Sequence, residues 1–187
     1  MFSAPRSRGI RILVVEDEAI VAADLESCLT SAGYQVIGVA SPELVEKMVP
    51  AHVQLGTKHA LVVHGMDGTD EISITGQSLC SEVKTGNFST SVYRISPEDF
   101  GLRSAPLESI EGGTVEENAE TILEIFAGAA GPKRDVVVLN AAAGLVAGSR
   151  VETLGQGVAL AQEIIDRGYA LAKLKQLIEF TQKLTEN

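Results

Sequence analysis

The sequence lacks several features that would identify broad classes of protein. Its 187 residues contain no tryptophan and only 4% aromatic residues. No apolar run approaches the roughly 20 residues that a membrane-spanning helix requires. Positive charge is also scarce, because 15 lysines and arginines stand against 25 acidic residues, for a formal net charge of −10. Nucleic acid and anionic membrane surfaces bind basic faces, so we expect neither as a partner.

Cysteine is equally scarce. The two cysteines, Cys28 and Cys80, do not have the spacing of a metal-binding or redox motif. Cys28 falls among apolar residues at helical spacing, which favours a buried, reduced thiol. Residues 1–8 contain arginines but no apolar segment, so we expect no secretory signal and a cytoplasmic protein.

What is present indicates a packed α/β protein. Hydrophobic residues make up 45% of the chain, and its length suits one sizeable domain over residues 1–187. Apolar runs at 11–15, 35–39 and 60–63 predict buried parallel strands, with 35–39 between the other two. A helical pattern over residues 19–32 joins the first two strands into a βαβ unit.

The later part of the chain predicts a hairpin followed by helices. Residues 79–83 and 88–95 flank a Lys-Thr-Gly-Asn turn, which indicates a β-hairpin. A capping box at Thr114 starts one predicted helix, and Thr153 starts another. Residues 134–147 are ambiguous, because their valine run suits a strand and their alanine run suits a helix. The last predicted helix covers residues 169–184.

Two acidic residues, Glu16 and Asp17, follow the first predicted strand, at the edge of a parallel sheet where ligands gather. With the flanking strands they make residues 10–40 resemble the opening of a response-regulator receiver domain. In receivers such a pair holds a divalent cation, so the resemblance implies a weak Mg²⁺ site here. The phosphorylated aspartate of receivers is missing, since the third strand runs into His64, and we expect no phosphorylation.

A second resemblance covers most of the chain. Residues 62–73 read Val-Val-His-Gly-Met-Asp-Gly-Thr-Asp-Glu-Ile-Ser, and residues 135–143 read Asp-Val-Val-Val-Leu-Asn-Ala-Ala-Ala. From about residue 38 onward the chain resembles the closing part of anthranilate phosphoribosyltransferases. In that family the pair that matches Asp70 and Glu71 helps to bind Mg²⁺ attached to phosphoribosyl pyrophosphate, which implies a second weak metal site. The resemblance also favours a helix over residues 134–147.

Two segments that complete the active site of this family have no counterpart in the sequence. The Gly-Thr-Gly-Gly-Asp loop that binds the pyrophosphate is absent, and so is a Lys-His-Gly-Asn-Arg segment. Catalysis needs groups that hold the two reactants together while charge develops on the leaving pyrophosphate. We therefore expect no catalytic residues, no required cofactor beyond weakly bound Mg²⁺, and no enzyme activity.

The sequence is thus interpreted as an engineered-looking chimera with a structural function. It would consist of a flexible tail (1–9), a receiver-like βαβ fragment (10–40) and a transferase-like remainder (41–187). We expect one three-layer α/β/α domain with a mainly parallel sheet and a β-hairpin excursion. Two alternatives are a truncated anthranilate phosphoribosyltransferase of tryptophan biosynthesis and a degenerate receiver-type signalling module. In the transferase family a helical domain covers part of the surface, and it belongs to the part that the sequence does not resemble. Apolar surface that is left uncovered tends to self-associate, so we expect self-association.

Other polar residues give weaker indications. His52, His59 and His64 stand among apolar residues without the spacing of metal ligands, so structural roles are favoured. Lys133 and Arg134 precede the helix expected near residue 135 and suit either a phosphate contact or a solvated loop.

Overall fold

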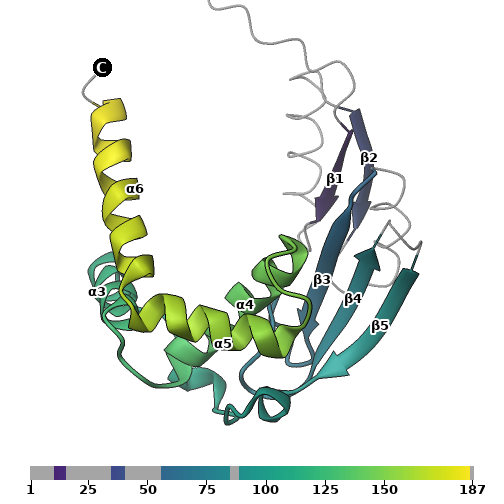
Figure 1. Ribbon diagram of the computed structural model, residues 1–187, viewed down its shortest axis with the longest axis horizontal. Coiled ribbons are helices and arrows are strands. Elements are labelled where there is room, and N and C mark those ends of the chain that lie inside the picture. Colours follow the sequence, from purple (N-terminus) through teal and green to yellow (C-terminus); the bar gives the residue numbers. More distant parts are fainter. Residues whose placement is uncertain (1–10, 16–34, 41–55, 85–88, 186–187) are drawn as a thin grey trace, which may run out of the picture.

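The computed structural model describes residues 11–15, 35–40, 56–84 and 89–185, which form two sheets and four α-helices (Figure 1). The strands are β1 (Arg11–Val15), β2 (Gln35–Ala40), β3 (His59–Gly65), β4 (Ser78–Lys84) and β5 (Ser89–Ile95). The helices are α3 (Val115–Phe126), α4 (Pro132–Ala147), α5 (Leu154–Asp166) and α6 (Tyr169–Thr185).

The arrangement of the strands corrects the sequence-based prediction. β1 and β2 pair in parallel, as expected. β3, which is expected beside β2 in one mainly parallel sheet, instead pairs with β4 in antiparallel register, and β5 continues that sheet. The loop between β3 and β4 (residues 66–77) contains no helix, and without a crossover helix the chain returns antiparallel. The described residues therefore form a mixed α/β fold with two small sheets.

The antiparallel pairing of β4 and β5 confirms the predicted hairpin. Ser78 lies opposite Ile95, and Lys84 lies opposite Ser89. The connecting residues, 85–88, lie outside the described residues.

Helix starts are confirmed where the sequence carries a capping box. The hydroxyl of Thr114 accepts the N–H of Glu117 at 3.2 Å, and the carboxylate of Glu117 accepts the N–H of Thr114 at 2.7 Å. Thr153 and Gln156 cap α5 in the same way. Each box satisfies two of the N–H groups that a helix start leaves unpaired, and both partners are close in sequence.

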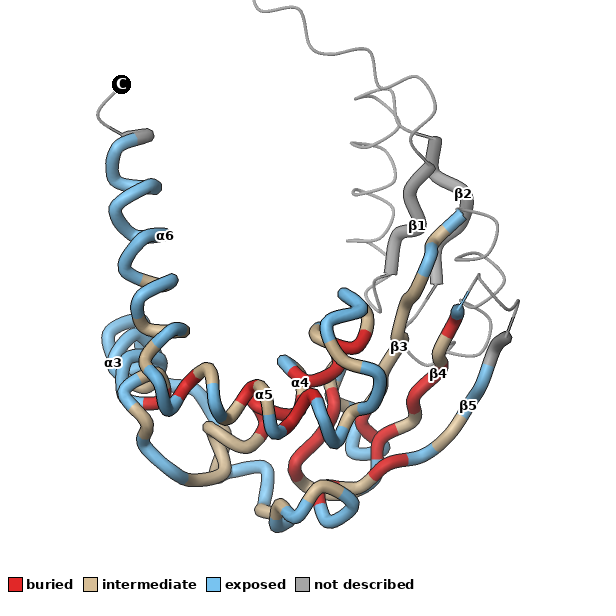
Figure 2. The backbone as a smooth tube through the Cα atoms, in the orientation of Figure 1, coloured by how far each residue is buried: buried red, intermediate tan, exposed pale blue. Residues whose placement is uncertain are grey.

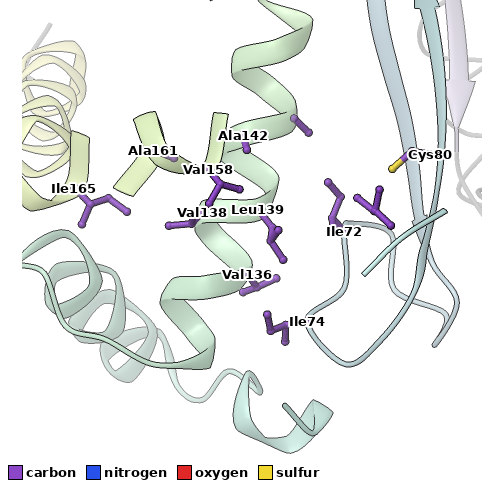
Figure 3. Packing of buried hydrophobic residues seen from close by; sticks show 12 residues of the cluster. Ile72, Ile74, Cys80, Val136, Val138, Leu139, Ala142, Val158, Ala161 and Ile165 are labelled. Atoms are coloured by element: carbon purple, nitrogen blue, oxygen red, sulfur yellow. The ribbon is translucent and has the colours of Figure 1, made fainter. Parts of the chain in front are cut away.

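The core lies between the antiparallel sheet and the helix pair α4–α5, where the buried residues concentrate (Figures 2 and 3). Val138 and Leu139 of α4 are 0% and 1% exposed. Ile72 and Ile74, from the loop after β3, pack into the same cluster as Cys80 of β4. Burial, and then the charge of a nearby glutamate, raises the pKa of the Cys80 thiol to about 12, so this cysteine is a protonated structural residue.

Gly157 allows α5 to approach α4 closely. A Cβ atom at position 157 would lie 2.8 Å from the carbonyl oxygen of Ala142 and 2.9 Å from its Cα and Cβ atoms. Any side chain there would push the two helices apart. The contact between α4 and α5 therefore depends on this glycine.

α6 extends away from the rest of the described chain and is mostly exposed (Figures 1 and 2). Leu177, Ile178 and Phe180 are 56%, 41% and 60% exposed. These three side chains form an apolar surface through which the predicted self-association could occur. Self-association itself stays a prediction. Neither α6 nor any other described helix combines the length and apolarity needed to cross a membrane.

Two leucine-to-alanine substitutions test this assignment of the core. Leu139→Ala removes side-chain atoms that are buried between α4 and the antiparallel sheet, so we expect a loss of about 2–5 kcal/mol in the free energy of unfolding. Leu177→Ala removes the same atoms from an exposed site and should cost less than about 0.5 kcal/mol. Urea denaturation measures both values, and equal losses would contradict the assignment.

Candidate functional site

The sequence-predicted pair Asp70 and Glu71 lies on the loop between β3 and β4, with Asp67 on the same loop. Asp70 is exposed and Glu71 is half-buried. Burial raises the pKa of Glu71, and the negative charges of Asp70 and Asp67 raise it further. A cation beside the pair would relieve this repulsion, and carboxylate oxygens are ligands that suit Mg²⁺.

Asp67 is the centre of the hydrogen bonding in the loop. Its Oδ1 atom accepts the backbone N–H of Thr69 at 3.2 Å and the hydroxyl of Thr69 at 2.9 Å. Its Oδ2 atom accepts the hydroxyls of Ser73 and Thr75, each at 2.5 Å. Burial alone would raise the pKa of Asp67, but these hydrogen bonds outweigh it and hold the pKa well below its ordinary range.

Asn140 of α4 fixes the other side of the loop to the core. Its side-chain carbonyl accepts the N–H of Ile72 at 2.9 Å, and its amide donates to the carbonyls of Ile72 and Val136, each at 3.0 Å. Ile72 is also buried, with 2% of its surface exposed. Asp70 and Glu71 therefore lie between two fixed points of the chain.

Gly65, the last residue of β3, leaves room for the loop to close. Its N–H donates to the carbonyl of Thr69 at 2.9 Å. A Cβ atom at position 65 would collide with the Thr69 hydroxyl and the Asp67 carboxylate. This close approach is possible only for a residue without a side chain.

The other sequence-predicted residues do not join this loop. Glu16, Asp17 and His52 lie outside the described residues. Arg134 donates to the carbonyl of Gly128 at 3.1 Å and to the carboxylate of Asp166 at 2.7 Å. These contacts link the start of α4 to the end of α5 and favour a structural role over a phosphate contact.

A second charged cluster crosses the antiparallel sheet. Glu82 Oε1 lies 2.8 Å from both His59 Nε2 and Lys84 Nζ, and the Tyr93 hydroxyl donates to Glu82 Oε2 at 3.4 Å. Burial alone would raise the pKa of Glu82, but the hydrogen bonds from Lys84 and His59 outweigh it and lower the pKa. These contacts agree with the structural role expected of His59. Among the described residues, no group of three His, Cys, Asp or Glu side chains is placed to hold a metal ion.

The sequence-based analysis did not identify the residues that shape the loop. Asp67 followed by glycine and threonine is typical of a turn in which aspartate accepts a nearby N–H, so its bond to Thr69 had a local signal. Ser73 and Thr75 reach Asp67 only once the whole loop has closed. Asn140 contacts the loop from a helix far away in the sequence, and no local pattern predicts that contact.

Comparison with known proteins identifies the relatives of this chain. The model of the family described as "Glycosyl transferase family, a/b domain" matches residues 26–171. Anthranilate phosphoribosyltransferase of Dehalococcoides mccartyi is 47% identical over 154 residues, which are 82% of this chain and 45% of the relative. That of Symbiobacterium thermophilum is 51% identical over 150 residues, 80% of this chain and 43% of the relative. The chain thus spans less than half the length of these curated relatives.

Solved structures agree with this result. Anthranilate phosphoribosyltransferase from Thermus thermophilus is 35% identical, with a TM-score of 0.69, and the match covers 88% of this chain and 51% of that one. The enzyme from Saccharomyces cerevisiae in complex with PRPP and Mg has a TM-score of 0.65. The two sequences are 24% identical, and the match covers 78% of this chain and 42% of that one. This match shows a likeness of fold.

These matches correct three expectations. The family model begins at residue 26, inside the segment 10–40 assigned to a receiver, so that assignment is wrong for residues 26–40. The interpretation as a chimera with a structural function is wrong. The expectation that the protein is not an enzyme is also wrong, because the family and these relatives are transferases. The receiver pattern misled because an apolar strand, a helix and a second strand recur in many unrelated α/β families. Of the interpretations considered, the matches favour the anthranilate phosphoribosyltransferase alternative.

A glycine-to-alanine pair tests how the loop closes. Gly65→Ala adds a methyl group where the Asp67 carboxylate and the Thr69 hydroxyl lie, so we expect the loop to open and the amides of residues 67–75 to exchange faster with solvent. Gly76→Ala is the matched control, because a Cβ atom there has no neighbour within 4 Å. Hydrogen exchange followed by NMR measures both, and equal protection in the two variants would contradict the close approach at Gly65.

The Glu82 cluster predicts a pH dependence of stability. Because its folded-state pKa is lowered, charged Glu82 stabilises the fold above its ordinary pKa of 4.5, and this contribution is lost as the pH falls below that value. We expect the thermal midpoint of the wild type to exceed that of Glu82→Gln at about pH 7, and the gap to shrink towards about pH 3. Circular dichroism melts across this range measure it. A gap that stays constant would show that the charge of Glu82 plays no part.

Proposed function

We propose that this chain, which belongs to the glycosyl transferase family, a/b domain, acts as part of an anthranilate phosphoribosyltransferase. Within that enzyme its role would be to hold the Mg²⁺ of phosphoribosyl pyrophosphate through Asp70 and Glu71. The observation that carries the proposal is the placement of this pair between two fixed points of the loop, Asp67 and the Asn140–Ile72 contact. Relatives of 47% and 51% identity that bear this enzyme's name support the choice of reaction.

The chemistry of the two side chains fits Mg²⁺. This ion usually binds proteins through one or two carboxylates and completes its shell with water and substrate phosphate oxygens. Asp70 is exposed, and Glu71 carries a raised pKa from burial and from the neighbouring negative charges, so a bound cation would lower the energy of both. The ion would offset the negative charge that collects on the pyrophosphate as it leaves the ribose.

The remaining groups of the active site would come from a part of the enzyme that this chain does not match. The chain spans 45% and 43% of the two relatives, and the Gly-Thr-Gly-Gly-Asp loop that the family resemblance implies has no counterpart in its sequence. Transfer needs the amine and the anomeric carbon to be held together, which the β3–β4 loop alone does not provide. Asp70 and Glu71 would therefore act by orienting the ion and its phosphate ligands.

The test is a transferase assay with anthranilate, phosphoribosyl pyrophosphate and Mg²⁺. It is run on the chain with and without a polypeptide that spans the rest of a relative. We expect turnover that falls by roughly 100-fold in Asp70→Asn and in Glu71→Gln, because each removes a charge that holds the ion against the leaving group.

Glu179→Gln is the matched control, since it neutralises an exposed glutamate of α6 and should leave turnover unchanged. Full turnover in the double variant of Asp70 and Glu71 would contradict the proposed role. So would the lack of turnover in every combination of chain and added polypeptide.

A further inference from the structure

We propose that Asp67 is a positioning residue of this metal site: its carboxylate closes the β3–β4 loop and holds Asp70 and Glu71 in place without contacting the ion. The inference rests on the proposed function, because it takes Asp70 and Glu71 as the ligands. It assigns separate roles to three carboxylates that lie within five positions of one another in the sequence.

The first argument is that both oxygens of Asp67 are already fully used. An ionised carboxylate offers about four acceptor positions, two on each oxygen. Thr69 fills two of them with its N–H and its hydroxyl, and the hydroxyls of Ser73 and Thr75 fill the other two. A metal ion could reach either oxygen only by displacing one of these donors.

The second argument is where the donors lie in the chain. Thr69 directly precedes Asp70, and Ser73 lies two residues after Glu71. Bonds from Asp67 to both therefore close the backbone around the pair. Contacts that orient the ligands of a metal site typically change its affinity by about 10–100-fold when they are removed.

The rival interpretation is that Asp67 is a third ligand, and Thr75→Val separates the two. The substitution removes one hydroxyl and leaves one acceptor position of Asp67 Oδ2 free. If Asp67 were a ligand, the freed oxygen should bind the ion as well as before or better. If Asp67 positions the loop, losing this bond should weaken binding. The two interpretations thus predict opposite changes.

The experiment uses NMR on the whole chain with Mn²⁺ and Mg²⁺ as probes. Broadening by Mn²⁺ identifies the amides nearest the ion, and we expect those of Asp70 and Glu71. Titration with Mg²⁺ then measures the dissociation constant, which should rise by about 10–100-fold in Asp67→Asn. Thr75→Val should change it in the same direction, whereas Thr75→Ser keeps the hydroxyl and should retain the wild-type value.

Asp99→Asn is the matched control for Asp67→Asn. The Asp99 carboxylate also accepts a backbone N–H, that of Ser96 at 2.8 Å, but it belongs to the short helix Pro97–Phe100, away from the loop. This variant should bind Mg²⁺ as the wild type does, because it loses a carboxylate hydrogen bond without touching the β3–β4 loop.

The outcomes separate the inference from the function on which it rests. Unchanged or tighter binding in Thr75→Val, or wild-type affinity in Asp67→Asn, overturns the positioning role and leaves the Asp70–Glu71 site intact. Failure of Mn²⁺ to broaden Asp70 and Glu71 in the wild type overturns the proposed function before any variant is compared. Weaker binding in Thr75→Val together with rescue by Thr75→Ser supports the inference, because a general loss of stability would not follow the hydroxyl.

Discussion

The packing of α4 between the antiparallel sheet and α5 is the constraint on which the rest of the structure depends. Towards the sheet, Leu139 packs with Ile72 in the buried cluster, and towards α5 the backbone of Ala142 lies against Gly157 (Figure 3). The same helix carries Asn140, which holds the β3–β4 loop by two hydrogen bonds to Ile72. A shift of α4 would therefore disturb the core and the candidate metal site together.

The burial of α4 against both the sheet and α5 also explains what the sequence could and could not predict. The capping box at Thr114 and the helix start at Thr153 were both predicted correctly, because the residues that mark each start lie within one helical turn. α4 was ambiguous because a helix that is buried on two sides has no polar stripe, and its valines resemble a buried strand. Only the family resemblance favoured the helix that the structure has. The antiparallel partner of β3 had no local signal, because strand neighbours are chosen by tertiary contacts.

The receiver interpretation failed at a different level. Parallel pairing of β1 with β2 was predicted from two apolar runs and an intervening helical pattern, and that pairing is present. Such a unit follows from the general physics of parallel sheets and is shared by unrelated families, so it does not identify one of them. The prediction of Asp70 and Glu71 rested on a longer resemblance, in which many residues match in order. The same resemblance indicated the family whose model covers residues 26–171. Asp67 belongs to the same motif, but its hydrogen bonds to Ser73 and Thr75 form only when the loop closes around it.

The loop shows how one fold can give neighbouring carboxylates different tasks. Glu71 is half-buried and Asp67 is exposed, and desolvation alone would raise the pKa of each. Donors from Thr69, Ser73 and Thr75 reverse that effect at Asp67, whereas Glu71 faces further negative charge from its neighbours. Environments that push two pKa values apart are a common way for a site to separate roles. Within the β3–β4 loop, Glu71 is therefore the carboxylate whose pKa the neighbouring negative charges of Asp70 and Asp67 raise. A divalent cation would therefore gain most from binding there, and Asp67, already satisfied, would lose hydrogen bonds by joining it.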